Sequence, residues 1–217
     1  APVNHPAVGV LGGTFNPVHV GHLRGALDCR DMLGLSAIRL MPAALPPLKA
    51  TPGVSAAHRA KMLDLAIVGT EGLSVDRREL DREGLSYTVD TLRELRQELG
   101  AEVAIVFIMG ADSLQRLNRW HEWRVLLEFT NIAVLARPPG DLQLPPELQS
   151  WLEEHEVPPS QLLRQTQGAV SRLVQPGLDV SSSAIRLGIE GDRNVRYLLP
   201  DRVLEYINAH GLYRCAK

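Results

Sequence analysis

Apolar stretches of strand length alternate along this chain with amphipathic stretches of helix length. The strand-like stretches are 7–11, 37–43, 73–80, 103–110 and 131–137, and the third is the most polar, as an edge strand would be. Helices are expected between them, over 20–33, 55–69 and 87–100, and a further helical stretch after 110. Ser55 is suited to cap the second helix and Gly100 to end the third. Strands that alternate with helices predict an α/β fold with a doubly wound parallel sheet and right-handed crossovers.

The alternation breaks between residues 138 and 177, where Pro, Glu and Gln are frequent and one short helix is expected at 146–154. We interpret this stretch as a surface insertion within one domain that spans residues 1–217. A helical C-terminal part, 181–217, follows it. Its helices are expected near 181–191, 194–199 and 200–211.

Composition narrows the class of protein. The 217 residues are 45% hydrophobic and 22% charged, as in an ordinary globular domain. The formal net charge is −2 and the basic residues are dispersed, so neither nucleic acid nor an anionic membrane is expected as a partner. Cys29 and Cys215 lie far apart without a CxxC pattern, and no signal-peptide or membrane-spanning pattern is present. These features predict a reduced, soluble, cytoplasmic protein, and they set no oligomeric state.

The first strand leads directly into GGTFNPVHVGH, residues 12–22. Glycines between a strand and a helix let backbone N–H groups approach an anion, and the helix N-terminus adds partial positive charge. The stretch matches neither the P-loop nor the GxGxxG pattern. His19 and His22 are three residues apart, which places both on one face of the first helical turn. This constellation suits a polyanion such as a triphosphate. A zinc site is not expected, because no third ligand lies nearby at a useful spacing.

A second anion site is expected at VSSSAIR, residues 180–186. Serines before an apolar-periodic segment favour a helix start, and Arg186 offers a forked, permanently charged donor for phosphate oxygens.

Together the two motifs resemble the signatures of the nucleotidylyltransferase superfamily with the H-x-G-H motif; Ser183 stands where the second signature has Thr. The resemblance runs along nearly the whole chain and is closest to the bacterial nicotinate mononucleotide adenylyltransferase family. Its further segments include HRAKMLDLAI, LSYTVDTL, FIMGADSL, RWHEW and INAHGLYR. It implies a Rossmann-like fold and an enzyme of NAD biosynthesis that makes nicotinic acid adenine dinucleotide and pyrophosphate from ATP and nicotinate mononucleotide.

The resemblance also implies roles for single residues. Trp120 is expected to stack on the nicotinate ring, and Asp112 to bond ribose hydroxyls. The expected ATP-binding residues are Gly12, Gly13, Thr14, Phe15, His19, His22, Gly110, Asp112, Ser182, Ser183, Ile185 and Arg186. The expected mononucleotide-binding residues are Tyr87, Thr88, Asp112, Trp120, His121 and Arg137. The chain departs from the family in the loop PPLK, where Leu48 stands in place of a histidine, so Lys49 is the phosphate contact expected there.

The mechanism expected from these residues is a direct in-line attack of the mononucleotide phosphate on the α-phosphorus of ATP. Catalysis would then consist of positioning and charge stabilisation by His19, His22, Arg186 and Lys49. Mg²⁺ is expected to arrive with ATP, mostly hydrated, with no dedicated protein site for a metal. Two alternatives stay open. One is a related adenylyl- or cytidylyltransferase, such as pantetheine-phosphate adenylyltransferase. The other is a nucleotide-binding protein without turnover.

Overall fold

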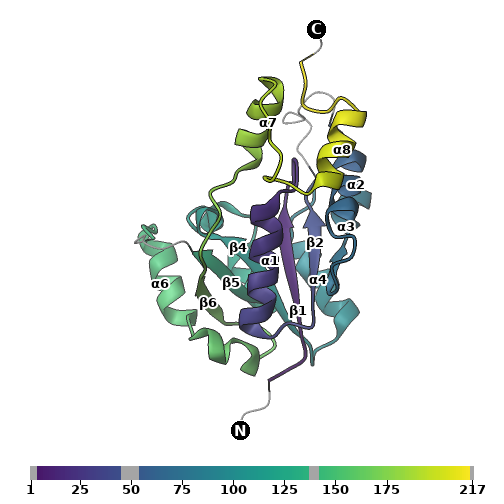
Figure 1. Ribbon diagram of the computed structural model, residues 1–217. Helices are drawn as coiled ribbons and strands as arrows, with labels where there is room; N and C mark the ends of the chain where they lie inside the picture. The colour runs from purple at the N-terminus through teal and green to yellow at the C-terminus, as the bar shows by residue number, and fades with distance from the viewer. Residues whose placement is uncertain (1–3, 45–53, 137–141, 216–217) are drawn as a thin grey trace.

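A computed structural model describes residues 4–44, 54–136 and 142–215. Within them, six parallel strands form one sheet in the order β3-β2-β1-β4-β5-β6 (Figure 1). The strands are β1 (Ala7–Gly13), β2 (Ala37–Pro42), β3 (Leu73–Val75), β4 (Ala104–Gly110), β5 (Asn131–Ala136) and β6 (Val170–Val174). The order of strands reverses between β1 and β4. Ligands of doubly wound proteins bind at such a reversal, beyond the carboxyl ends of the strands.

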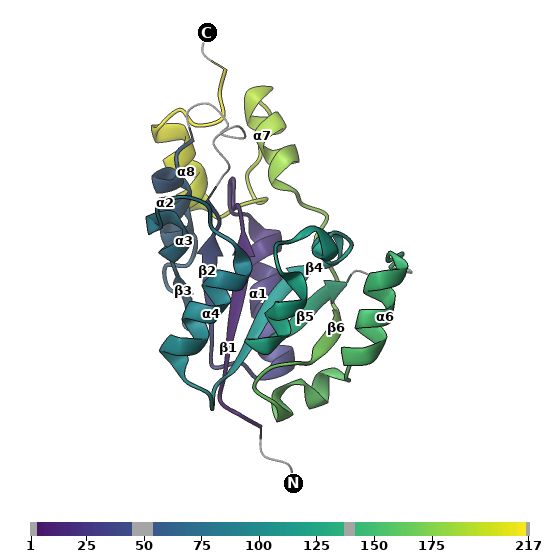
Figure 2. The ribbon, with the colours of Figure 1, turned by 180° about the vertical axis from the view of Figure 1, so that it is seen from behind.

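Helices cover both faces of the sheet. Helix α1 crosses the face seen in Figure 1, and α4 crosses the opposite face, seen in Figure 2. The helices are α1 (Val20–Leu33), α2 (Ala56–Ala66), α3 (Arg78–Asp81), α4 (Thr88–Leu99), α5 (Ala111–Leu114), α6 (Pro146–His155), α7 (Ser182–Glu190) and α8 (Asp201–Ala209). Short 3₁₀ helices add η2 (Leu117–Arg119), η3 (Trp123–Glu128) and η4 (Pro159–Arg164). None of the helices in the described residues is long and apolar enough to cross a membrane.

Successive side chains of β1 enter different cores. Val10 packs with Leu92 and Leu95 in the core under α4, whereas Leu11 packs with Ala26 and other residues in the core under α1. Adjacent residues of a strand point to opposite faces, so a strand buried on both faces must be apolar throughout. The apolar run of β4 has the same cause.

Gly9 is the position in β1 with the least room. A Cβ atom there would lie 2.9 Å from Leu35 Cδ1, 3.0 Å from Ile38 Cγ1 and 3.1 Å from Ile108 Cδ1. We therefore expect Gly9→Ala to lower the free energy of unfolding by about 1–3 kcal/mol, because three buried side chains must shift. Urea denaturation measures the effect. Gly110→Ala is the matched control, since a Cβ there meets no heavy atom within 4 Å; equal midpoints for the two variants would contradict the prediction.

Most of the predicted elements are confirmed. The first helix has the predicted bounds, and Ser55 Oγ accepts the His58 N–H, 3.2 Å away, at the start of α2. The strand predicted at 73–80 is an edge strand, but it is shorter than predicted. Asp76 ends it because its carboxylate accepts the backbone N–H and the guanidinium of Arg78, which opens α3.

The interpretation of 138–177 as a surface insertion is wrong for the residues that the structure describes there. The predicted helix is present as α6, but Leu148 and Trp151 on it are buried in the core that also holds residues of β4 and β5. The chain then adds β6, which pairs in parallel with β5 along Ile132–Ala136. Ser171 and Arg172 interrupt the apolar run of this strand, which hid it from the sequence pattern.

The helical tail needs a smaller correction. Helices α7 and α8 are present, but residues 194–199 form turns and no helix. This segment passes close to the start of α1, where the carbonyl of Leu198 accepts the Val20 N–H at 3.0 Å.

Candidate active site

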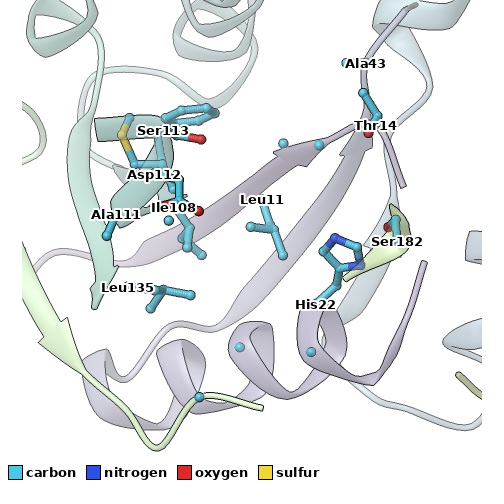
Figure 3. Close-up of a pocket in the computed structure, with 18 of the residues that line it drawn as sticks. Leu11, Thr14, His22, Ala43, Ile108, Ala111, Asp112, Ser113, Leu135 and Ser182 are labelled. Carbon is cyan, nitrogen blue, oxygen red and sulfur yellow. The ribbon is translucent and has the colours of Figure 1, made fainter. Parts of the chain in front are cut away.

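A cleft of about 1000 Å³ opens at the carboxyl ends of β1 and β4, where the strand order reverses. Figure 3 shows Thr14, His22 and Ser182 gathered on one side of it, with Asp112 and Ser113 on the other. The two glycines that end β1 and the first turn of α1 form part of its wall. The cleft thus brings the two sequence motifs together although they are far apart along the chain.

His19 caps α1. Its Nδ1 accepts the backbone N–H groups of Gly21 at 3.1 Å and His22 at 3.3 Å. His22 Nδ1 in turn accepts the backbone N–H of His19 at 3.1 Å, which completes a reciprocal capping box built from two imidazoles. The rings stack with centroids 3.7 Å apart. Gly21 is required here because a Cβ at that position would lie 2.9 Å from His19 Cε1.

These contacts assign the proton positions on the two rings. An Nδ1 atom that accepts an N–H carries no proton, so each neutral ring holds its proton on Nε2. Burial, together with the neighbouring His19, lowers the pKa of His22 from 6.5 to about 3. His22 is therefore neutral at physiological pH and has an Nε2–H group that can donate a hydrogen bond, and the sequence could not show this.

The loop between the first glycines and α1 is held by the C-terminal part of the chain. Arg186 Nη1 donates to the carbonyl of Asn16 at 2.7 Å, and Ser182 Oγ donates to the carbonyl of Pro17 at 2.8 Å. Tyr213 Oη donates to Asn16 Oδ1 at 2.6 Å. Phe15 has a left-handed φ of 47° and packs edge-on against His22 with ring centroids 4.9 Å apart. The second motif thus braces the first: its Ser182 and Arg186 hold the loop that contains Asn16 and Pro17 in place.

Predicted ATP-binding residues fall into two groups. Gly12, Gly13, Thr14, His19, His22, Gly110, Asp112 and Ser182 line the cleft. Phe15, Ser183, Ile185 and Arg186 are not among its lining residues. Phe15 and Ile185 are buried in the core, and Arg186 donates to Ser183 Oγ at 3.3 Å as well as to the Asn16 carbonyl. These four residues do not line the cleft in this structure; Phe15 packs against His22, and Arg186 holds the loop before α1.

On the mononucleotide side, Thr88 and Trp120 line the cleft, and Trp120 packs edge-on against Phe107 with ring centroids 6.2 Å apart. Tyr87 and His121 do not line it. They pack against each other at 4.3 Å between ring centroids, and both are exposed. Arg137 and the loop that contains Leu48 and Lys49 lie outside the described residues.

Sequence reasoning missed Glu79, a buried carboxyl group that lines the cleft from α3. It accepts the hydroxyl of Thr91 at 2.9 Å, and burial raises its pKa above the ordinary value. No fixed spacing connects the two residues in a known motif. In the sequence, Glu79 is visible only as an acidic residue shortly before Tyr87 and Thr88. Its place at the cleft becomes clear only when α3 and α4 are seen side by side.

Comparison with known proteins defines first the class and then the family. Residues 10–188 match the cytidylyltransferase-like family, so the doubly wound sheet and the paired motifs are those of a nucleotidylyltransferase. A relative from Pseudomonas putida (strain W619), named a probable nicotinate-nucleotide adenylyltransferase, is 44% identical over 95% of this chain and 94% of its own. One of the same name from Pseudomonas aeruginosa (strain UCBPP-PA14) is 43% identical over 95% of this chain and 97% of its own. The chain belongs to the nicotinate-nucleotide adenylyltransferase family.

A solved structure supports the same fold. The Plasmodium falciparum nicotinic acid mononucleotide adenylyltransferase, determined in complex with NaAD, superimposes with a TM-score of 0.72. The alignment covers 96% of this chain and 98% of the other, at 16% sequence identity.

Proposed function

We propose that this protein transfers the adenylyl group of ATP to nicotinate mononucleotide and releases pyrophosphate. The product is nicotinic acid adenine dinucleotide, an intermediate of NAD biosynthesis. The observation that carries the proposal is the reciprocal histidine cap of α1. Two imidazoles with their protons on Nε2 stand at one end of a cleft large enough for a dinucleotide, in a chain of this family. We place the reaction in the cytoplasm, as the sequence predicts, with small molecules as its partners.

The reaction is a single displacement at phosphorus. An oxygen of the mononucleotide 5′-phosphate attacks the α-phosphorus of ATP, the bond from that phosphorus to the bridging oxygen of the β-phosphate breaks, and pyrophosphate departs with the electron pair. The attacking phosphate is already an anion, so no general base is required. The protein has to align the two phosphates and stabilise the charge that develops on their oxygens.

The side of the cleft with His19, His22 and Thr14 is proposed to hold the phosphates. The Nε2–H groups of the histidines donate to phosphate oxygens, and backbone N–H groups between Gly13 and Phe15, at the end of β1, add further donors beside the N-terminus of α1. Arg186 and, in the undescribed loop, Lys49 are proposed to act on the departing pyrophosphate.

The opposite side is proposed to hold the mononucleotide. Asp112 is exposed beside Gly110 and can bond ribose hydroxyls, and Thr88 lies at the N-terminus of α4, where backbone N–H groups suit a carboxylate. Trp120 offers a ring face for stacking on the pyridine. Tyr87, His121 and Arg137 remain predicted contacts at this end.

We propose that Mg²⁺ enters with ATP. No group of three or more His, Cys, Asp and Glu side chains that could hold a metal is present among the described residues. Asp112 is a carboxylate at the cleft that could add one oxygen ligand. This donor set fits a hydrated ion held mainly by the triphosphate, and Mg²⁺ would supply neutralisation of its charge there.

A substrate panel tests the proposal. Purified protein with ATP and Mg²⁺ is given nicotinate mononucleotide, nicotinamide mononucleotide, phosphopantetheine or no second substrate, and pyrophosphate release and dinucleotide formation are measured. We expect turnover with nicotinate mononucleotide. Product only from phosphopantetheine, or no pyrophosphate from any pair, would refute it. The His22→Ala protein, purified in the same way, controls for a contaminating enzyme.

A further inference from the structure

Arg59 on α2 is a buried arginine directly behind the first motif. Only 1% of its surface is exposed. Its Nη1 donates to the carbonyl of Thr14 at 2.7 Å and to the carbonyl of Ala43 at 2.8 Å. Both of these residues line the cleft, and Figure 3 shows them next to each other on the side of His22 and Ser182. One guanidinium thus ties the segment after β1 to the segment after β2.

No carboxylate described in the structure balances the charge of Arg59. The group forms no ion pair with the Asp and Glu side chains of the described residues, and its buried Nε has no hydrogen-bond partner. A buried charge without a counter-ion is strongly unfavourable, and burial lowers the pKa of this arginine. Arginine nevertheless stays protonated in proteins. The positive charge is therefore retained at a cost to stability.

The geometry indicates how this charge affects the cleft. The carbonyl oxygens of Thr14 and Ala43 are bound by Arg59, so they cannot present negative dipoles to an anion in the cleft. Arg186 does the same to the carbonyl of Asn16, two residues further along. Because His22 is neutral, it provides hydrogen bonds and no net charge at this end. Fixed positive charge behind the loop then complements the histidines in front of it.

We propose that Arg59 is a positioning residue that makes the phosphate end of the cleft attractive to the triphosphate of ATP, by binding the carbonyls of Thr14 and Ala43 and by its uncompensated charge. This inference rests on the proposed function, because it assigns the triphosphate to this end. Arg59 does not touch the nucleotide. It acts through the loop, so its effect should follow the charge of the ligand and leave the nucleoside part unaffected.

The test compares three ligands by isothermal titration calorimetry: ATP, inorganic tripolyphosphate and adenosine. In Arg59→Gln the side-chain amide can still donate to a carbonyl, but the charge is lost. We expect ATP and tripolyphosphate to bind about tenfold more weakly to this variant, because a unit charge near a desolvated phosphate site is removed. We expect the affinity of the variant for adenosine to stay within about twofold of wild type, because adenosine has no net charge with which Arg59 could interact. Arg59→Lys keeps the charge, so its affinity for tripolyphosphate should stay within about threefold of wild type.

Arg96 on α4 provides a matched control. It too donates to backbone carbonyls, including those of Phe129 and Thr166, and burial lowers its pKa. These carbonyls precede β5 and β6, at the end of the sheet opposite the cleft. Arg96→Gln should therefore reduce the thermal midpoint without changing the binding of any of the three ligands.

The possible results separate the inference from the proposed function. Unchanged tripolyphosphate affinity in Arg59→Gln, or an equal loss of adenosine affinity, would overturn the role of Arg59. If Arg59→Gln does not fold, the Arg59→Lys protein decides the question. A tenfold loss of its affinity for tripolyphosphate would overturn the role of the charge, whereas retained affinity would support that role. The product formed by the wild-type enzyme tests the proposed function independently of these ratios.

Discussion

Replacing His22 by alanine is expected to reduce kcat by about 10²–10³-fold, the usual cost of removing one preorganised donor to a charged transition state. The Nε2–H of His22 is proposed to donate to an oxygen of the reacting phosphates, and alanine leaves that oxygen without its partner. Pyrophosphate release at saturating ATP and nicotinate mononucleotide measures the loss. Turnover within about threefold of wild type would contradict a role in stabilising the transition state.

Two further variants separate chemistry from folding in this experiment. His22→Asn retains a side-chain acceptor close to the position of Nδ1, where the His19 N–H donates, but lacks the Nε2 donor. A comparable loss of kcat in this variant, with an unchanged thermal midpoint, would assign the effect to Nε2. His210→Ala removes an exposed histidine at the end of α8 and should leave kcat unchanged.

The same histidine has a defined pH signature. The folded protein holds His22 neutral down to about pH 3, whereas the unfolded chain takes up its proton near pH 6.5. Protonation therefore favours unfolding, and stability is lost as the pH falls from about 6.5 towards 3. Between pH 6 and 8 the charge of His22 does not change, so this residue should add no inflection to the profile of kcat.

The fold could be predicted from the sequence where the hydrophobic pattern was strong. The bounds of α1 followed from its periodicity and the turn residues before it, and β1, β4 and β5 followed from runs that are apolar because both faces of the sheet are covered. Strand β6 could not be recognised. Its exposed Arg172 and its buried Ser171, which donates to the carbonyl of Val157, break the apolar run.

The site could be predicted only as far as its residue types. The two motifs indicated an anion site, and the structure brings His22 and Ser182 to one cleft. Their orientation depends on contacts between distant parts of the chain, such as the bond from Tyr213 to Asn16. The neutral state of His22 depends on burial, which a sequence motif does not encode. Arg59 lies in the family-like segment HRAKMLDLAI, but its role could not be predicted, because its partners are backbone carbonyls of distant segments.

Arg186→Ala is the second change with a large expected effect, and it tests how the two motifs cooperate. We expect kcat/KM for ATP to fall about 10²-fold, because the variant loses the charged donor that is proposed to act on the pyrophosphate and also the bond that holds the Asn16 carbonyl. Steady-state kinetics with nicotinate mononucleotide in excess measures the loss. Arg193→Ala, which removes an exposed arginine beyond the end of α7, controls for the change in net charge.

The contribution of bracing can be isolated at Ser182, whose hydroxyl holds the Pro17 carbonyl without carrying charge. Ser182→Ala should reduce kcat/KM only about two- to fivefold, the cost of one neutral hydrogen bond. If it proves as damaging as Arg186→Ala, the second motif acts chiefly by holding the loop in place, with Phe15 against His22. If Arg186→Ala retains wild-type kcat/KM, neither its charge nor its bond to Asn16 serves the reaction. The difference between the two losses therefore measures what the guanidinium charge adds to the bracing of the first motif.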